Sequence, residues 1–220
     1  MRPISISGSI AQLFERLILN RNYRSFGTSK NQFGFKKKSC KLALFCITEA
    51  IIKYIEKHSE CYIISLDAEK AFDKLWRDGK FYKRFNKLEK KEWLVLKKYY
   101  KISEAKIVCN GIFSKQFKIV TGVKQGGILS PFLFNIFFDG LVDDILKLNM
   151  WAKIGNINMN IVSYCDDINL LFSSPVHGKV MLKLCEEFSE KRRMIFISKK
   201  SNMVIYGDPL FKKVRSRIKN

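Results

Sequence analysis

The spacing of apolar residues along the chain predicts alternating helices and strands. Apolar side chains recur at helical spacing over residues 10–18, which predicts an amphipathic helix with Ser9 as its N-cap and Glu15 on its solvent side. The apolar, β-branched run at residues 61–67 predicts a buried strand that ends on Asp67. A carboxylate is therefore expected at the end of an otherwise apolar strand.

Turn signals divide the second half of the chain. An Asn-Gly pair at residues 110–111 lies between apolar runs and predicts a tight hairpin. A Ser-Pro pair at residues 130–131 predicts the N-cap and first residue of a helix that runs to about residue 148. The remaining predicted elements are helices over residues 42–55, 79–102 (a pair) and 179–189, and strands over residues 117–120, 160–164, 168–172, 194–197 and 203–206.

This alternation favours an α+β fold with a mixed or antiparallel sheet covered by helices on one face. No linker or internal repeat interrupts the chain, so one continuous domain is expected. The Gly-rich bend at residues 122–127 does not carry the G-x-G-x-x-G pattern after a strand. A dinucleotide-binding Rossmann fold is therefore not expected.

Charge narrows the classes of partner. The 220 residues include 41 Lys and Arg against 20 Asp and Glu, a formal net charge of +21, while 47% of the residues are hydrophobic. A chain this apolar can form a core, so the charge is not that of a disordered basic tail. Nucleic acid phosphates or an anionic membrane surface are the expected partners, because clustered Lys and Arg release counterions from a polyanion. Basic side chains interleaved with Phe over residues 21–41 favour nucleic acid.

Membrane insertion, secretion and a zinc site are not expected. The longest apolar stretches fall far short of the roughly 18 residues that a membrane span needs. The first residues lack the apolar segment of a signal peptide, which leaves a nuclear or a cytoplasmic location open. Six cysteines without a C-x-x-C pair, and only two histidines, predict reduced and mostly buried thiols.

The candidate chemistry lies in three aspartates at strand ends. Asp67 follows one apolar strand, and Asp166 and Asp167 lie between two others. Gathered in apolar surroundings, carboxylates raise each other's pKa unless cations compensate. Magnesium prefers such oxygen ligands, and two ions can clamp the oxygens of a phosphoryl transfer. Each piece also has an ordinary interpretation as turn chemistry or a helix-leading bend; the order and spacing together favour a nucleotidyl transfer site.

An ordered set of motifs resembles the reverse transcriptase domain of non-LTR retrotransposons of the jockey type. The resemblance covers nearly the whole chain, and its motifs are most specific from Asp67 through Asp167. The motifs are Arg2-Pro3-Ile4-Ser5, QFGF at 32–35, SLDAEKAFD at 65–73, GVKQGGILSPFLFNIFFD at 122–139, SYCDD at 163–167 and Lys200-Ser201.

The resemblance implies a right-hand polymerase that extends a DNA primer on an RNA template with deoxynucleoside triphosphates. Fingers would occupy residues of about 1–60 and the palm residues of about 61–208 with some fingers segments, making residues 1–208 the reverse transcriptase domain, followed by a basic tail at 209–220. Its palm sheet is antiparallel and backed by helices. Relative to the family the chain is expected to be truncated at both ends, with the thumb missing. The alternative is a catalytically inactive retroelement fragment that only binds nucleic acid.

The resemblance also assigns residue roles. Asp67, Asp166 and Asp167 would be catalytic and would hold two magnesium ions, with the Ala68 carbonyl as an additional ligand. Phe72 would exclude the 2′-hydroxyl of a ribonucleotide; the alternative for Phe72 is an ordinary buried aromatic.

Further positions would contact the incoming nucleotide. Gln125 and Gly126 would line it and the template base, and Arg2 would contact its triphosphate. Lys200 would support the pyrophosphate, with Lys199 as a competitor for that role. The chain departs from the family pattern at Ile197, where Asn is usual.

Overall fold

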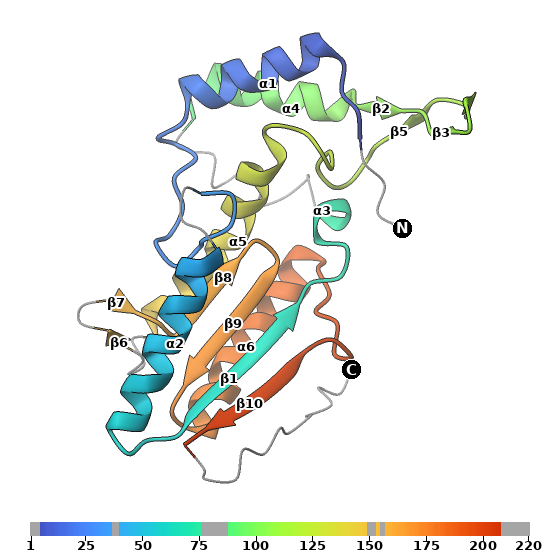
Figure 1. Cartoon of the computed structure of the whole chain (residues 1–220). Coiled ribbons are helices and arrows are strands. Elements are labelled where there is room, and N and C mark those ends of the chain that lie inside the picture. Colours follow the sequence, from blue (N-terminus) through green and yellow to red (C-terminus); the bar gives the residue numbers. More distant parts are fainter. Residues whose placement is uncertain (1–4, 37–39, 76–87, 149–152, 155–156, 208–220) are drawn as a thin grey trace.

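The computed structural model describes residues 5–36, 40–75, 88–148, 153–154 and 157–207 (Figure 1). Arg2, the basic tail at 209–220 and most of the first helix predicted within 79–102 lie outside the described residues.

The core of the fold is an antiparallel sheet of four strands in the order β10-β1-β9-β8. Its strands are β1 (Cys61–Asp67), β8 (Ile161–Tyr164), β9 (Asp167–Phe172) and β10 (Asn202–Tyr206). All four were predicted to within a residue. The α+β class and the antiparallel sheet are thus confirmed.

The strand predicted over 194–197 is wrong. This segment makes only one isolated bridge, between Phe196 and Ala68. It is entered from Arg193 in the left-handed conformation, and a turn follows, in which the amides of Lys200 and Ser201 donate to the Ile197 carbonyl. Two changes of chain direction this close together leave no room for a strand.

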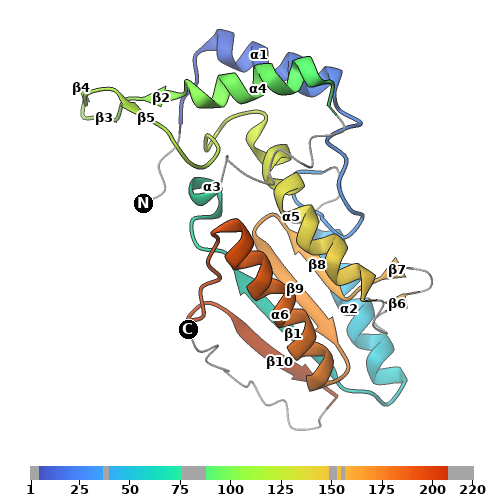
Figure 2. The ribbon, with the colours of Figure 1, turned by 180° about the vertical axis from the view of Figure 1, so that it is seen from behind.

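Helices cover both faces of the sheet rather than one. Helices α5 (Ser130–Lys147) and α6 (Pro175–Arg192) pack on one face, and α2 (Cys40–Glu56) packs on the other (Figures 1 and 2). Alternate residues of β1 supply the two cores: Ile64 and Leu66 lie in the cluster with α5 and α6, whereas Ile63 lies in the cluster with α2.

A helical pair lies beyond the end of the sheet. Helix α1 (Ser9–Arg21) runs beside α4 (Lys90–Lys101) in both ribbon views. The remaining short elements are α3 (Ala71–Lys74), β2 (Glu104–Ala105), β3 (Val108–Cys109), β4 (Ile112–Phe113), β5 (Phe117–Lys118), β6 (Lys153–Ile154) and β7 (Ile157–Asn158). The hairpin β3–β4 confirms the Asn-Gly prediction, with Asn110 and Gly111 both at positive φ.

The orientation predicted for α1 is wrong. Glu15 is fully buried, while Ile10 and Leu13 are 86% and 59% exposed, and the N-cap is Gly8 rather than Ser9. The helix itself was correctly predicted, but the hydrogen bonds of Glu15 to Tyr99 and to the Leu129 amide decide which face points inward.

The N-cap predicted for α5 is also wrong. Leu129 occupies that position and Ser130 is already helical, so the proline falls within the first turn. No side chain of the helix itself caps this terminus.

All six cysteines are free thiols, of which Cys61, Cys165 and Cys185 are buried while Cys40 and Cys109 are exposed. The expectation of mostly buried thiols therefore holds for half of them. Within the described ranges, no helix is long and apolar enough to cross a membrane.

Candidate active site

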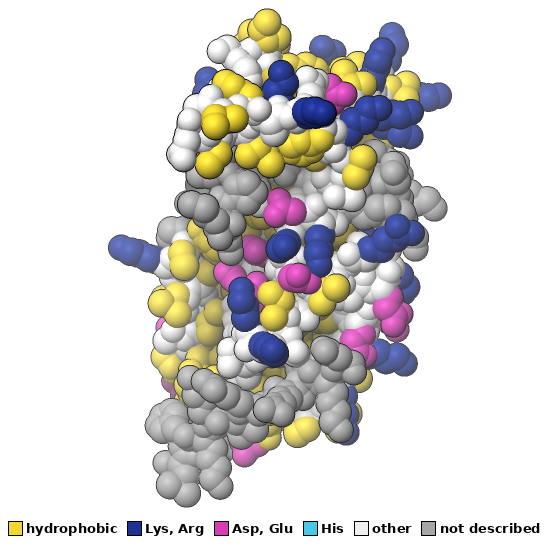
Figure 3. Space-filling view, turned by 90° about the vertical axis from the view of Figure 1, so that its right-hand side faces the viewer, with side chains coloured by type: hydrophobic (Ala, Val, Ile, Leu, Met, Phe, Trp, Pro, Cys, Tyr) yellow, Lys and Arg dark blue, Asp and Glu magenta, His cyan; other side chains and the backbone are white. Residues whose placement is uncertain are grey.

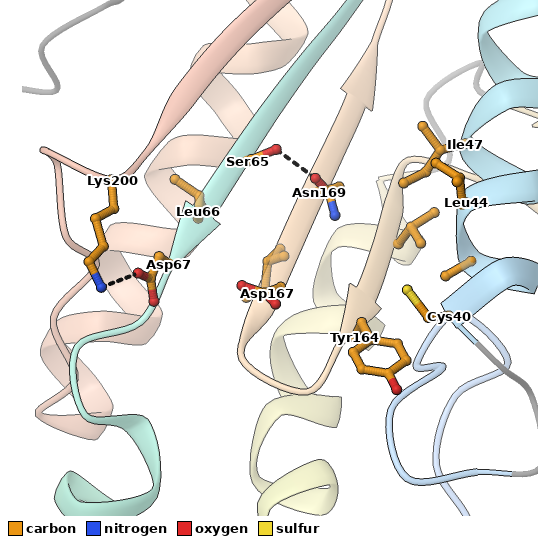
Figure 4. Close-up of a pocket in the computed structure, with 13 residues that line it drawn as sticks. Cys40, Leu44, Ile47, Ser65, Leu66, Asp67, Tyr164, Asp167, Asn169 and Lys200 are labelled. Carbon is orange, nitrogen blue, oxygen red and sulfur yellow. Dashed lines mark hydrogen bonds and ion pairs between the residues drawn. The ribbon is translucent and has the colours of Figure 1, made fainter. Parts of the chain in front are cut away.

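The fold brings the three predicted aspartates to one end of the sheet. Asp67 ends β1 and pairs in register with Asp167, which begins β9. Asp166 lies in the tight turn between β8 and β9, next to Cys165. Figure 4 shows Asp67 and Asp167 at neighbouring strand ends. Asp67 and Asp166 are partly buried and Asp167 is exposed, so all three carboxylates lie where a ligand from solvent can approach.

The face that carries these aspartates is polar only near their end of the sheet. Ser65 lies two residues before Asp67, and Asn169 lies two residues after Asp167, so both share this face. The Ser65 hydroxyl donates to the Asn169 side-chain oxygen at 2.6 Å. Further along β1, Ile63 on this face is buried beneath α2. The sheet face is therefore apolar where α2 covers it and polar at the end of the sheet that lies near the start of α2.

A groove of about 330 Å³ lies along this boundary (Figure 4). Cys40, Leu44 and Ile47 from the first half of α2 form one wall. Asp67 of β1 and Asp167 of β9 line the same groove. An open groove with one apolar wall and carboxylates on its floor can accept an extended ligand that also brings cations.

Lys200 contacts the first aspartate. Its Nζ lies 3.0 Å from Oδ2 of Asp67 (Figure 4). The turn at residues 197–201 positions this lysine, because the Ile197 amide donates to the Asp67 carbonyl and the Lys200 amide donates to the Ile197 carbonyl. Of the two lysines that the sequence left as alternatives, Lys200 is the one that reaches the carboxylate.

The donor set suits a hard divalent cation in its chemistry, since carboxylate oxygens are the ligands that magnesium prefers. Among the described residues, however, no group of three or more His, Cys, Asp or Glu side chains is gathered closely enough to hold a metal ion. The backbone next to Asp67 is compatible with a further ligand: the flanking backbone hydrogen bonds use the Asp67 carbonyl and the Glu69 amide, not the Ala68 carbonyl.

In the turn that carries Asp166, the residue Cys165 is both buried and conformationally strained. Cys165 adopts a left-handed conformation with φ of 58°. Burial, and then the charges of Asp166 and Asp167, raise the pKa of the Cys165 thiol to about 12. The thiol therefore stays neutral near pH 7 and adds no charge to the site.

Phe72 lies in an aromatic cluster beside the site. Its ring stacks on Phe134 of α5 with centroids 4.3 Å apart, and Phe35 meets it edge-on at 6.2 Å. The side chain is only partly buried. Packing against the core thus fixes the ring while leaving part of it accessible.

The Gly-rich bend is held against α3. The Val123 amide donates to the Phe72 carbonyl, and Nε2 of Gln125 donates to Oδ1 of Asp73 at 2.7 Å. A Cβ on Gly122 would lie 2.5 Å from the Asp73 carbonyl oxygen, so only glycine allows this approach. Gln125, with its neighbour Gly126 at φ of 100°, is therefore brought next to the Phe72 segment.

The other side of the bend is held by a residue that was predicted to face solvent. Glu15 accepts from the Tyr99 hydroxyl at 2.7 Å and from the Leu129 amide at 3.1 Å. Lys124 donates to the same hydroxyl at 3.0 Å and lies 4.5 Å from the Tyr99 ring centroid. Burial, and then the bond to Glu15, raise the pKa of Tyr99. The Glu15 carboxylate thus caps α5 in place of Ser130.

Acidic and basic side chains share one face of the molecule. Figure 3 shows acidic side chains near the middle of this face, with lysine and arginine side chains around them. The lysine and arginine side chains attract a polyanion, and the acidic side chains between them can bind cations.

Comparison with known proteins gives a consistent result. The chain matches the family described as "Reverse transcriptase (RNA-dependent DNA polymerase)" over residues 1–217. It is 29% identical over 178 residues to the RNA-directed DNA polymerase from mobile element jockey of Drosophila funebris, covering 79% of this chain and 19% of that protein. It is 28% identical over 190 residues to the retrovirus-related Pol polyprotein from type-2 retrotransposable element R2DM of Drosophila melanogaster, covering 85% and 18%. The chain thus spans about a fifth of the length of these relatives.

A solved structure shares the fold. Telomerase from Candida tropicalis in complex with the TWJ fragment of telomeric RNA superposes with a TM-score of 0.60 at 16% identity, covering 92% of this chain and 33% of that one. At this identity the likeness concerns the fold alone.

Proposed function

Because this chain belongs to the reverse transcriptase (RNA-dependent DNA polymerase) family, we propose that it is the RNA-directed DNA polymerase domain of a non-LTR retrotransposon. The observation that carries the proposal is the register pairing of Asp67 with Asp167, with Asp166 in the adjoining turn. Carboxylates on adjacent strand ends suit the magnesium-dependent transfer of a nucleotidyl group.

The proposed architecture is that of a right-hand polymerase, to which this chain contributes the fingers and the palm. The palm, at residues of about 61–208, consists of the four-stranded sheet with α5 and α6. The fingers comprise residues of about 1–60 together with α4 and the β3–β4 hairpin. The antiparallel sheet backed by helices supports this division.

Asp67, Asp166 and Asp167, with the Ala68 carbonyl, would hold two magnesium ions. When bound, the ions supply the positive charge that activates the primer 3′-hydroxyl and neutralises the triphosphate and the departing pyrophosphate. The chain's own contribution is to present the carboxylates from rigid strand ends and a tight turn.

The nucleotide-binding roles rest on the residues around α3. Phe72 would exclude a 2′-hydroxyl, because stacking on Phe134 holds its ring beside the site. Gln125 and Gly126 would line the incoming nucleotide. Lys200 would support the pyrophosphate from its place beside Asp67. Arg2, outside the described residues, would contact the triphosphate.

The proposed partners are an RNA template, a DNA primer and deoxynucleoside triphosphates. The net charge of +21 supports binding to nucleic acid. The rival function is nucleic-acid binding without turnover, which is favoured by one observation: the Lys200 ammonium lies on Asp67, where a metal ion is expected.

Primer extension on a homopolymer RNA template with magnesium tests the proposal. We expect incorporation by this chain that is lost in Asp166→Asn. Asp144→Asn is the matched control, because Asp144 is an exposed residue of α5 that forms an ion pair with its helix neighbour Lys147. Salt-sensitive binding of the template without incorporation by the unmodified chain would contradict the polymerase and support the rival.

A further inference from the structure

The turn that carries Asp166 is held by the side chain of a distant glutamine. Gln32 is fully buried. Its side-chain oxygen accepts from the Cys165 amide at 3.0 Å and from the Gly34 amide at 2.9 Å. Its side-chain nitrogen donates to the Ser163 hydroxyl at 2.9 Å. The same nitrogen also donates to the Cys165 carbonyl at 3.4 Å, so both ends of one amide reach the turn itself.

The backbone around Gln32 is docked on β8. The Phe33 amide donates to the Ser163 carbonyl at 2.8 Å, and the Ser163 amide donates to the Asn31 carbonyl at 2.9 Å. Gln32 and Ser163 form a parallel bridge. The loop therefore lies beside β8 like a short added strand, which places the Gln32 side chain next to the turn.

The loop also approaches the turn too closely for any side chain. A Cβ on Gly34 would overlap the Cys165 sulfur and lie 2.5 Å from the Cys165 nitrogen. Nδ2 of Asn135 in α5 donates to the Gly34 carbonyl at 2.7 Å, which ties the loop to the helix behind the sheet. The loop thus packs directly against Cys165, on one side of the turn.

These contacts explain how a strained residue is kept in place. Cys165 has a side chain yet adopts a left-handed conformation, which persists only where the surroundings determine it. The Gln32 oxygen binds the amide of this residue, and the nitrogen binds the residue two positions earlier. Together they fix the backbone from which the Asp166 and Asp167 side chains project.

We infer that Gln32 is a positioning residue whose side-chain amide holds Cys165 in its left-handed conformation and so sets the direction of the Asp166 and Asp167 carboxylates. The inference deepens the proposed function, since it rests on these carboxylates forming the metal site.

Gln32→Met tests the inference, because methionine keeps the length of the side chain and removes both hydrogen-bonding ends. Asn160→Leu is the matched control: Asn160 is equally buried, and its side chain binds the Leu171 carbonyl rather than the turn. Gln32→Glu is the conservative variant, because its carboxylate can still accept from the Cys165 amide.

Hydrogen exchange of the Cys165 amide is the first readout. We expect it to be about tenfold faster in Gln32→Met after correction for global stability, the change for one lost buried hydrogen bond. Gln32→Glu should restore part of the protection, and Asn160→Leu should leave it unchanged. If Gln32→Met and Asn160→Leu accelerated exchange of the Cys165 amide equally, Gln32 would be merely structural and the inference would be overturned.

Manganese binding, measured by electron paramagnetic resonance, is the second readout. We expect Gln32→Met to weaken binding and Asn160→Leu to leave it unchanged. Unaltered manganese binding in Gln32→Met would overturn the inference that Gln32 sets the direction of the Asp166 and Asp167 carboxylates. If the unmodified chain binds manganese but extends no primer, the proposed polymerase activity fails while both readouts still decide the role of Gln32.

Discussion

At the end of β1, the Asp67 carboxylate faces an ammonium group. The Lys200 side chain is 61% exposed, so water screens its attraction to Asp67 and the pair contributes little to folding. Its significance is local, because the ammonium competes with any cation that the aspartate binds.

Removing this ammonium separates two roles of Lys200. Lys200→Met should strengthen manganese binding by up to about fivefold, the equivalent of one exposed ion pair. It should also lower incorporation, because support for the pyrophosphate is lost. Spin-resonance titration and primer extension measure the two effects. Lys199→Met is the control and should change neither; weaker ion binding in Lys200→Met would contradict the competition.

Phe72 allows a test of sugar selection. Phe72→Val shortens the side chain, so the preference for deoxynucleotides over ribonucleotides should fall by about ten- to a hundredfold. The ratio of kcat/KM for the two substrates measures it. Phe26→Val, in a core aromatic that packs on Phe132, should lower stability without changing that ratio. An unchanged ratio in Phe72→Val would leave Phe72 as the ordinary core aromatic.

At the scale of elements, α1 is linked to α4 and α5 through one buried carboxylate. Glu15 accepts hydrogen bonds from Tyr99 in α4 and from the amide of Leu129, the N-cap of α5. Lys124 of the bend at 122–127 donates to the same Tyr99 hydroxyl, so this cluster also supports the segment that carries Gln125.

Glu15→Gln should lower the free energy of unfolding by about 1–2 kcal/mol, because it removes the charge at the N-terminus of α5 and one acceptor. Urea unfolding measures this change. Glu190→Gln, the same substitution at an exposed position of α6, should stay within about 0.5 kcal/mol of the unmodified chain. Equal stability of the two variants would show that Glu15 does not cap α5.

At the scale of the whole molecule, the positive net charge and the acidic candidate site have complementary roles. The net charge of +21 attracts phosphates over much of the surface, whereas the aspartates concentrate at one end of the sheet. A basic surface cannot recruit metal ions, so the two functions need different residues.

Binding to an RNA–DNA duplex should therefore depend steeply on salt. Six or more phosphate contacts would lower affinity by about a thousandfold between roughly 50 and 200 mM salt. Fluorescence anisotropy measures this slope. A duplex analogue with an uncharged backbone is the control and should show little dependence; a flat slope for the natural duplex would contradict binding through the phosphates.

How much could be predicted from the sequence differs between these scales. Strand β1 was predicted at its exact bounds, because a continuous β-branched run is a local signal. The strand expected at 194–197 was wrong, since an apolar run does not specify a pairing partner. The three aspartates were singled out from their place at strand ends, and the register of β1 and β9 then brought Asp67 opposite Asp167.

The sequence by itself determined most helices and strands and the acidic residues between them, because side-chain periodicity and turn chemistry act over a few neighbouring positions. Only the tertiary structure decided that Glu15 faces inward and that Gln32 reaches a turn 133 residues away. Both outcomes depend on contacts between segments far apart in the chain, which no local pattern encodes.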